Sequence, residues 1–119
     1  MSSWCVLCWE DRPTIDGRVI ERGALVWRTD QPLPLLVHLR ETPDYAPSFL
    51  IGTVGDIQRR PDGAITGELS HPIVGLAPEI DLALGDSTNV PGEPFTIIRA
   101  RLSAVTLGIA PVWLDLRIQ

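Results

Sequence analysis

Short apolar runs separated by turn-forming residues are the main pattern along the chain. Runs of this kind, bounded by Gly, Pro and Asp, predict β-strands, because they have the length of strands rather than of helices. Asp62-Gly63, between two of the runs, is a strong hairpin signal. Residues 96–106 alternate partly between apolar and polar, as expected for a strand with one face in water. The predicted strands cover residues 4–9, 18–20, 24–27, 33–39, 49–57, 64–69, 80–84 and 95–107, with a short final strand near 117–118.

Prolines and glycines limit the helix content. Eleven prolines and ten glycines are spread through the sequence, and these residues interrupt helices and mark turns. The only plausible helical stretch is 73–82, and Gly75 and Pro78 interrupt it. Many short strands in one small chain suggest a closed or nearly closed barrel, which removes exposed sheet edges. We therefore expect a mostly β, small single-domain β-barrel with little helix that spans residues 1–119.

The composition and charge of the 119-residue chain exclude several functional classes. Hydrophobic residues make up 45% of the chain, which indicates a globular protein. The formal net charge of −5 argues against nucleic-acid binding, which needs clustered basic residues to neutralise phosphates. No apolar run approaches the roughly 20 residues that span a bilayer, so we expect no membrane partner. The start of the chain, residues 1–4, lacks the features of a signal peptide.

Cys5 and Cys8 form a lone CxxC pair within the first predicted strand. Residues three apart on a strand face opposite sides, and a redox CxxC normally lies at a strand-to-helix junction. Zinc would need two further ligands, and His38 and His71 are the only histidines. We interpret both residues as structural cysteines, with zinc binding and redox chemistry as the alternatives, and we expect no cofactor and no metal.

Three segments follow one another in a recognisable order. The first is 13–27 (PTIDGRVIERGALVW). The second joins 33–38 (LPLLVH) and 51–57 (IGTVGDI) to a hairpin that ends in GEL at 67–69. The third is 104–113 (AVTLGIAPVW). In this order and spacing they resemble the prohead (capsid maturation) proteases of tailed bacteriophages, and the first segment is similar to members from phages of actinobacteria.

The resemblance implies a β-barrel with packed helices and a Ser nucleophile activated by a His base, with a further His or acid assisting. His38 matches the catalytic His of the family. The stretch PEIDL at 78–82 places Glu79 where the family has its Ser, and Ala104 stands where many members carry an acid. The family's connecting helix is reduced here to 70–77. The resemblance therefore identifies no confident catalytic residue and leaves His38 as a vestigial one.

Other residues offer alternative chemistry. Ser70, Ser87 and Ser103 are candidate replacements for the missing nucleophile. Glu79 and Asp81 are two apart and would share a strand face, where paired carboxylates suggest glycosidase or aspartic chemistry. An ordinary solvated face is the simpler interpretation of these two carboxylates.

Four tryptophans are many for a chain of this length. A tryptophan often anchors an interface, because it buries a large area with few rotatable bonds. All four are therefore candidates for contact with a partner, and filling of the barrel core is the alternative. They are Trp4, Trp9, Trp27 and Trp113.

A family scaffold without its chemistry favours reuse for binding. The first hypothesis is a minor capsid or decoration protein of the virion, assembled in the host cytoplasm, which binds the major capsid protein in multiple copies. Each copy would bridge neighbouring subunits through apolar anchors and edge-strand pairing, which adds binding free energy to the shell. The alternatives are an active minimal prohead serine protease that processes scaffold and capsid, and a cellular β-barrel binding module.

Overall fold

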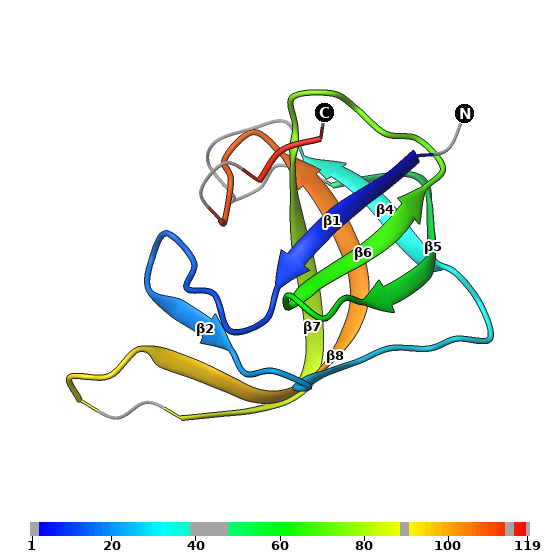
Figure 1. The fold of residues 1–119 in the computed structure, drawn as a ribbon. Helices are drawn as coiled ribbons and strands as arrows, with labels where there is room; N and C mark the ends of the chain where they lie inside the picture. Colours follow the sequence, from blue (N-terminus) through cyan, green and yellow to red (C-terminus); the bar gives the residue numbers. More distant parts are fainter. Residues whose placement is uncertain (1–2, 39–47, 89–90, 114–115, 119) are drawn as a thin grey trace.

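The computed structural model describes residues 3–38, 48–88, 91–113 and 116–118, and within these ranges the chain forms strands and no helix. The strands belong to one mixed sheet that curls strongly into a half-barrel (Figure 1). The described part of the chain accordingly contains no helix that could cross a membrane. The strands are β1 (Ser3–Trp9), β2 (Arg18–Ile20), β3 (Leu25–Val26), β4 (Leu33–His38), β5 (Phe49–Arg59), β6 (Ala64–Leu69), β7 (Ala77–Thr88) and β8 (Phe95–Gly108).

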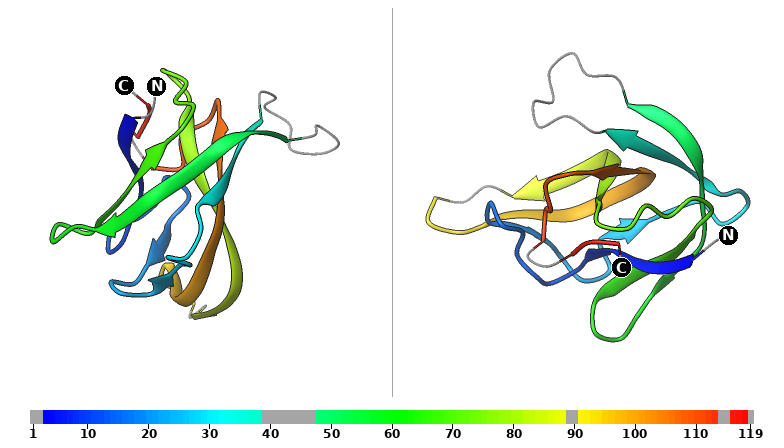
Figure 2. Two further views of the ribbon diagram at one scale, coloured as in Figure 1. Left: turned by 90° about the vertical axis from the view of Figure 1, so that its right-hand side faces the viewer. Right: turned by 90° about the horizontal axis from the view of Figure 1, so that it is seen from above.

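β8 is the central strand of the sheet. β7 runs antiparallel along one of its sides. Along the other side, β2, β3 and β4 follow one another in parallel orientation, opposite residues 95–97, 100–101 and 105–108. From β4 the sheet continues antiparallel through β5 and β6 to β1. β1 and β7 are therefore the two outer strands of the half-barrel (Figure 2).

The predicted hairpin at Asp62-Gly63 is confirmed. It joins β5 to β6, and Gly63 has a φ of 95°, which a residue without Cβ adopts at little cost. Asp62 stabilises the turn by accepting a hydrogen bond from the backbone N–H of Ala64 at 3.1 Å. The prediction of a mostly β fold with little helix is also confirmed, and the predicted closed or nearly closed barrel is a half-barrel.

The one plausible helical stretch, 73–82, forms no helix. Residues 77–88 form β7, the longest strand but one. Gly75 has a φ of 89°, which no α-helix accommodates, and Pro78 follows within the same stretch. Pro78 is tolerated in β7 because an outer strand has one side without a ladder partner, where a missing N–H costs little.

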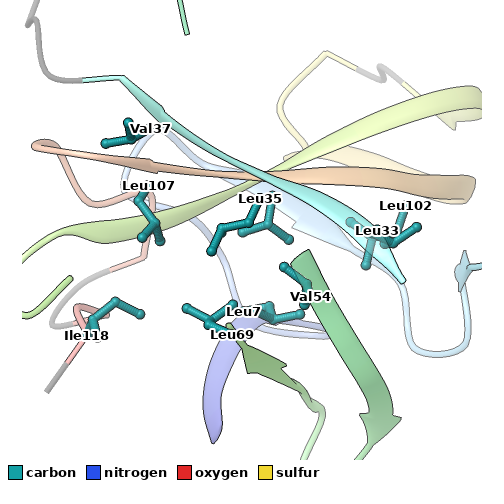
Figure 3. Packing of buried hydrophobic residues seen from close by; sticks show 10 residues of the cluster. Leu7, Leu33, Leu35, Val37, Val54, Leu69, Leu102, Leu107 and Ile118 are labelled. Atoms are coloured by element: carbon teal, nitrogen blue, oxygen red, sulfur yellow. The ribbon is translucent and has the colours of Figure 1, made fainter. Parts of the chain in front are cut away.

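The concave side of the sheet holds two adjoining hydrophobic clusters. The first is built from alternate side chains of β4 and β8 that meet side chains of β1, β5 and β6 (Figure 3). Leu35 and Leu107 are completely buried there, opposite Leu7 and Leu69. The second cluster contains Trp113 together with Cys8, Ile20, Ala24, Leu25, Ile65 and Ala100.

Residues 116–118 lie across the open side of the half-barrel, beside β1 in the two views of Figure 2. Ile118 belongs to the first hydrophobic cluster and Trp113 to the second. The backbone of Ile118 donates to Leu76 O at 2.7 Å and accepts from Gly75 N–H at 2.8 Å. The strand predicted near 117–118 is thus a short extended pairing rather than a regular strand, and it covers core that the sheet alone leaves open.

Candidate functional site

The three positions that the resemblance assigns to catalysis lie on neighbouring strands. His38 ends β4, Ala104 lies in β8 and Glu79 lies in β7. Leu36 of β4 and Glu79 both lie opposite Thr106 of β8. Because side chains opposite one another on adjacent strands share a face and alternate residues return to it, all three positions lie on the outer face of the sheet.

His38 and Glu79 are nevertheless too far apart to interact directly. His38 lies opposite Gly108, which in turn lies opposite Ala77, two residues before Glu79. Two strand spacings of about 4.8 Å and two steps of about 3.3 Å separate their Cα atoms by about 12 Å. The buried Nε2 of His38 has no hydrogen-bond partner among the described residues. Within the part of the chain that the structure describes, Nε2 of this histidine therefore has no proton donor within the reach that a general base needs.

Two of the three candidate serines do not approach His38. The Ser103 hydroxyl donates to the backbone carbonyl of Asp81 at 2.9 Å. Ser87 lies opposite Ile97, toward the other end of β7 from Ala77 and its register partners. The carboxylate of Asp81 accepts a hydrogen bond from the Thr106 hydroxyl at 2.9 Å, which favours a structural role for this carboxylate.

Ser70 does contact a histidine, but the histidine is its neighbour in sequence, His71. Ser70 Oγ lies 2.8 Å from His71 Nδ1 and accepts a hydrogen bond from the Thr53 backbone N–H at 2.8 Å. Both side chains lie close over Gly52 of β5. A Cβ at Gly52 would overlap Ser70 Oγ and would lie 2.6 Å from His71 Nδ1. The missing side chain of Gly52 is thus what admits a Ser–His contact, the elementary unit of nucleophile activation.

The tryptophans divide between the core and the surface. Trp113 is only 2% exposed, and its indole N–H donates to Arg12 O at 3.0 Å. The Trp113 ring therefore fills the hydrophobic core and is not exposed to a partner, so Trp113 is not an interface residue of the kind expected from the sequence. Trp4 of β1 is 47% exposed and remains an interface candidate.

Trp9 and Trp27 are half-buried, and each carries an arginine over its ring. The Arg12 guanidinium lies 4.8 Å from the Trp9 ring centroid, and that of Arg59 lies 5.2 Å from the ring centroid of Trp27. Such cation–π contacts stabilise the rings at the surface of the fold, and they occupy part of the area that an interface would use.

A buried carboxylate that the sequence pattern did not reveal follows β1. The side chain of Glu10 is fully buried and accepts hydrogen bonds from Arg59 Nε at 2.8 Å and from the Leu25 backbone N–H at 3.3 Å. Arg59 Nη2 also donates to Leu25 O at 2.6 Å. The pair ties together β1, β3 and β5, which lie far apart in sequence, and it gives Arg59 a structural rather than a solvated position.

Both cysteines face the interior, contrary to the expectation that they point to opposite sides. A bulge in β1 between Val6 and Cys8 shifts the register, so that Cys5 contacts the first hydrophobic cluster and Cys8 belongs to the second. Burial raises the pKa of Cys5 to about 11 and raises the pKa of Cys8 further. Protonated thiols are poor nucleophiles and metal ligands. Among the described residues, no group of three or more His, Cys, Asp or Glu side chains could hold a metal ion.

A cleft lies elsewhere, between the β3–β4 loop and β5. It encloses about 350 Å³ and is lined by 27–32 and 54–57. Asp56 lies at this cleft and also at a smaller neighbouring one of about 190 Å³ that includes Ser70. Asp56 has a φ of 51°, an uncommon conformation for a residue other than glycine.

Comparison with protein-family models, with curated proteins and with solved structures finds no match to this chain. The geometry alone therefore separates three features: an outer face with His38 and no aligned serine, a Ser70–His71 contact over Gly52, and an unfilled cleft beside Asp56.

Proposed function

We propose that this protein is a structural component of a phage virion that binds the lattice of the major capsid protein and stabilises the shell. In this proposal the fold is a reduced barrel of the prohead-protease type that has lost its proteolytic site. The protein would act in multiple copies in the capsid, after assembly in the host cytoplasm. Such a passive binder stabilises a shell simply by binding the assembled form and not the free subunits.

The observation that supports the proposal best is how the three positions that the resemblance assigns to catalysis lie on β4, β8 and β7. The topology brings the positions of His38, Ala104 and Glu79 to one face, as a shared ancestor with the proteases would require. None of the three supplies a hydroxyl, and His38 Nε2 has no partner among the described residues. A scaffold that keeps the arrangement without the nucleophile fits a protein retained for binding.

An arm formed by the far ends of β7 and β8 suits contact with a neighbouring subunit. This arm, residues 83–88 and 95–101, extends away from the half-barrel with β2 along one side (Figure 1). Phe95 is 38% exposed and Ile98 is 41% exposed on it. On its other side β7 has no strand partner within the described residues. Unpaired backbone groups of this kind accept an added strand, and the apolar side chains would anchor it.

The composition of purified particles tests the proposal. Denaturing gel analysis of mature particles should show a band at the 13.1 kDa of this chain, in a copy number comparable to that of the major capsid protein. A maturation protease, in contrast, acts inside the prohead and is usually lost by self-cleavage. Absence of the band from mature particles would exclude the decoration role.

A pair of matched variants tests the arm. Ile98→Asp should abolish co-sedimentation with particles that lack the protein, because it places a charge among the apolar contacts. Val74→Asp serves as the control, since Val74 is 74% exposed between β6 and β7, outside the arm. If both variants bind equally well, the arm is not the contact.

The Ser70–His71 contact favours a second candidate function, that of a small serine hydrolase or minimal prohead protease. In that case a fluorophosphonate probe should label the wild-type protein at Ser70, and Ser70→Ala should lose both the label and any processing of scaffold or capsid. His38→Ala distinguishes the family site from this one, because it would abolish processing only if His38 is the base. If the wild-type protein is not labelled and processes neither scaffold nor capsid protein, the hydrolase hypothesis is excluded and the structural role is the remaining candidate.

A further inference from the structure

We propose that the cleft between the β3–β4 loop and β5 binds a neutral saccharide, one or two sugar rings of a glycan. The proposal does not depend on the capsid role, because it uses neither the β7–β8 arm nor the outer face that carries His38. It rests on the size of the cleft, the chemistry of its walls and the backbone of Asp56.

The size of the cleft suits a small ligand. Its volume of about 350 Å³ lies within the range of roughly 300–1,000 Å³ that is typical of small-molecule sites. The wall from the β3–β4 loop and the wall from β5 come from segments more than twenty positions apart in sequence, so the fold rather than a local turn creates the space.

Apolar side chains line part of the cleft. They are the completely buried Val54, Ile57 and the half-buried Trp27. The Arg59 guanidinium lies over the Trp27 ring and fixes its position. Apolar side chains held in place in this way offer contact area to the C–H groups of a sugar ring with little loss of conformational entropy.

Polar side chains that line the cleft provide both donors and acceptors. Thr29, Gln31 and Asp56 line the cleft, and none of the hydrogen bonds within the described residues involves their side chains. A hydroxyl, an amide and a carboxylate together match the mixed donors and acceptors of sugar hydroxyls. Apolar surface with a few such convergent polar groups is the usual composition of a ligand site.

The backbone conformation of β5 positions Asp56 at the cleft. A register shift of the β5–β6 ladder between Gly55 and Gln58 marks a bulge, and Asp56 within it has a φ of 51°. Bulges reorient side chains beside functional sites, and a non-glycine residue in this region is strained.

The charges at the cleft favour a neutral ligand. Arg28 and Asp30 bond to each other, with Arg28 Nη2 2.7 Å from Asp30 Oδ2, and so neutralise one another. The pKa of Asp30 is lowered by this hydrogen bond, which keeps the pair charged and mutually engaged. Asp56 alone remains, and it would repel a phosphate or another anion while accepting hydrogen bonds from sugar hydroxyls.

Nuclear magnetic resonance on the full chain tests the inference. The probes are cellobiose, maltose and N,N′-diacetylchitobiose, each at millimolar concentration, and the readouts are saturation transfer to the sugar and the four indole N–H signals. We expect at least one disaccharide to receive saturation and to shift the Trp27 signal while the signals of Trp4 and Trp113 stay in place. If none of the three shifts the Trp27 signal, or if the Trp4 signal moves instead, the inference is wrong.

Asp56→Gly provides a variant that should fold well, because glycine accepts the positive φ. It should weaken binding by about tenfold, the loss expected for one hydrogen bond to a charged group. Trp4→Ala is the control and should bind like the wild type. Unchanged binding by Asp56→Gly would overturn the assignment, and so would preference for a tetralysine peptide over every disaccharide, since that result would indicate a basic protein segment as the ligand.

Discussion

At the scale of single residues, two glycines of β5 that look alike in the sequence differ in what surrounds them. A Cβ at Gly52 would overlap Ser70 Oγ and crowd the His71 ring, whereas a Cβ at Gly55 would meet nothing within 4 Å. Only the first glycine is therefore required by packing. No local pattern could reveal this difference, because Ser70 reaches Gly52 only after β5 and β6 pair.

Gly52→Ala should lower the free energy of unfolding by about 1–3 kcal/mol, the usual cost of overpacking. Gly55→Ala is the matched control and should change it by about 0.5 kcal/mol or less, as expected for an unobstructed position. Urea denaturation of both variants measures the difference. The double variant Gly52→Ala/Ser70→Ala should recover part of the loss, and no recovery would show that the hydroxyl is not the obstacle.

The two interior thiols should make stability depend on alkaline pH. Burial raises the pKa of Cys5 from 9.0 to about 11 and raises that of Cys8 further. Above the unfolded-state pKa the unfolded chain releases thiol protons that the folded protein retains, so the unfolded state gains stability as pH rises. Between about pH 8 and about pH 10 the free energy of unfolding should fall by about 1 kcal/mol for each thiol.

Denaturation at several pH values measures this decline. The double variant Cys5→Ala/Cys8→Ala should be less stable at neutral pH but should show a flatter profile, and the difference between the two profiles isolates the thiols. Equal slopes for both proteins would mean that the thiols are accessible to water.

At the scale of elements, the sequence predicts strands better than it predicts how they meet. Apolar runs and the Asp62-Gly63 turn correctly indicate the strands, because strand length and turn chemistry are local properties. The segment 73–82 was the only plausible helical stretch in the sequence, and its pairing with β8, which is distant in the chain, makes residues 77–82 part of a strand. The bulge in β1 likewise depends on register with β6, and it turned Cys8 inward against the simple alternation.

The candidate sites, like the strand pairings, depend on contacts between segments that are distant in sequence. The positions of His38 and Glu79 could be aligned with a family from the sequence, but their separation follows from the order β4, β8, β7. The Glu10–Arg59 pair joins residues 49 positions apart, and the cleft beside Asp56 joins a loop to a bulge. Contacts of this kind arise from tertiary packing and leave no periodic signal in the chain.

The Glu10–Arg59 pair should be essential for holding β1, β3 and β5 together. Arg59→Leu would leave a fully buried carboxylate without its cation, and we expect a loss of about 3 kcal/mol in the free energy of unfolding. Arg60→Leu changes the next residue, which is exposed, and should cost about 0.5 kcal/mol or less.

Thermal and chemical denaturation compare these two variants. Because the cost arises from the unpaired charge, Glu10→Leu/Arg59→Leu should be more stable than Arg59→Leu alone. A double variant as unstable as the single one would indicate that Arg59 acts through its contact with Leu25 and Trp27 instead.

At the scale of the whole molecule, the half-barrel is completed by chain that is not part of the sheet. β1 and β7 do not pair with each other, and the C-terminal segment lies across the space between them. Trp113 and Ile118 supply the apolar side chains that this space needs. Residues 116–118 should therefore order together with the core.

Trp113→Ala should cost about 3–5 kcal/mol, because it removes the largest fully buried side chain and leaves a cavity in the second hydrophobic cluster. Trp113→Phe keeps most of the apolar contact but loses the hydrogen bond to Arg12 O, so it should cost less. Trp4→Ala, on the exposed β1 surface, should change stability little.

Hydrogen exchange shows whether the C-terminal segment can open separately from the sheet. The backbone amide of Ile15 bonds to Val112 O, and that of Ile118 bonds to Leu76 O. In Trp113→Phe both amides should lose protection from exchange, while the amides of the β5–β6 ladder remain protected. Uniform loss across the sheet would instead mean that the segment and the sheet unfold as a single unit.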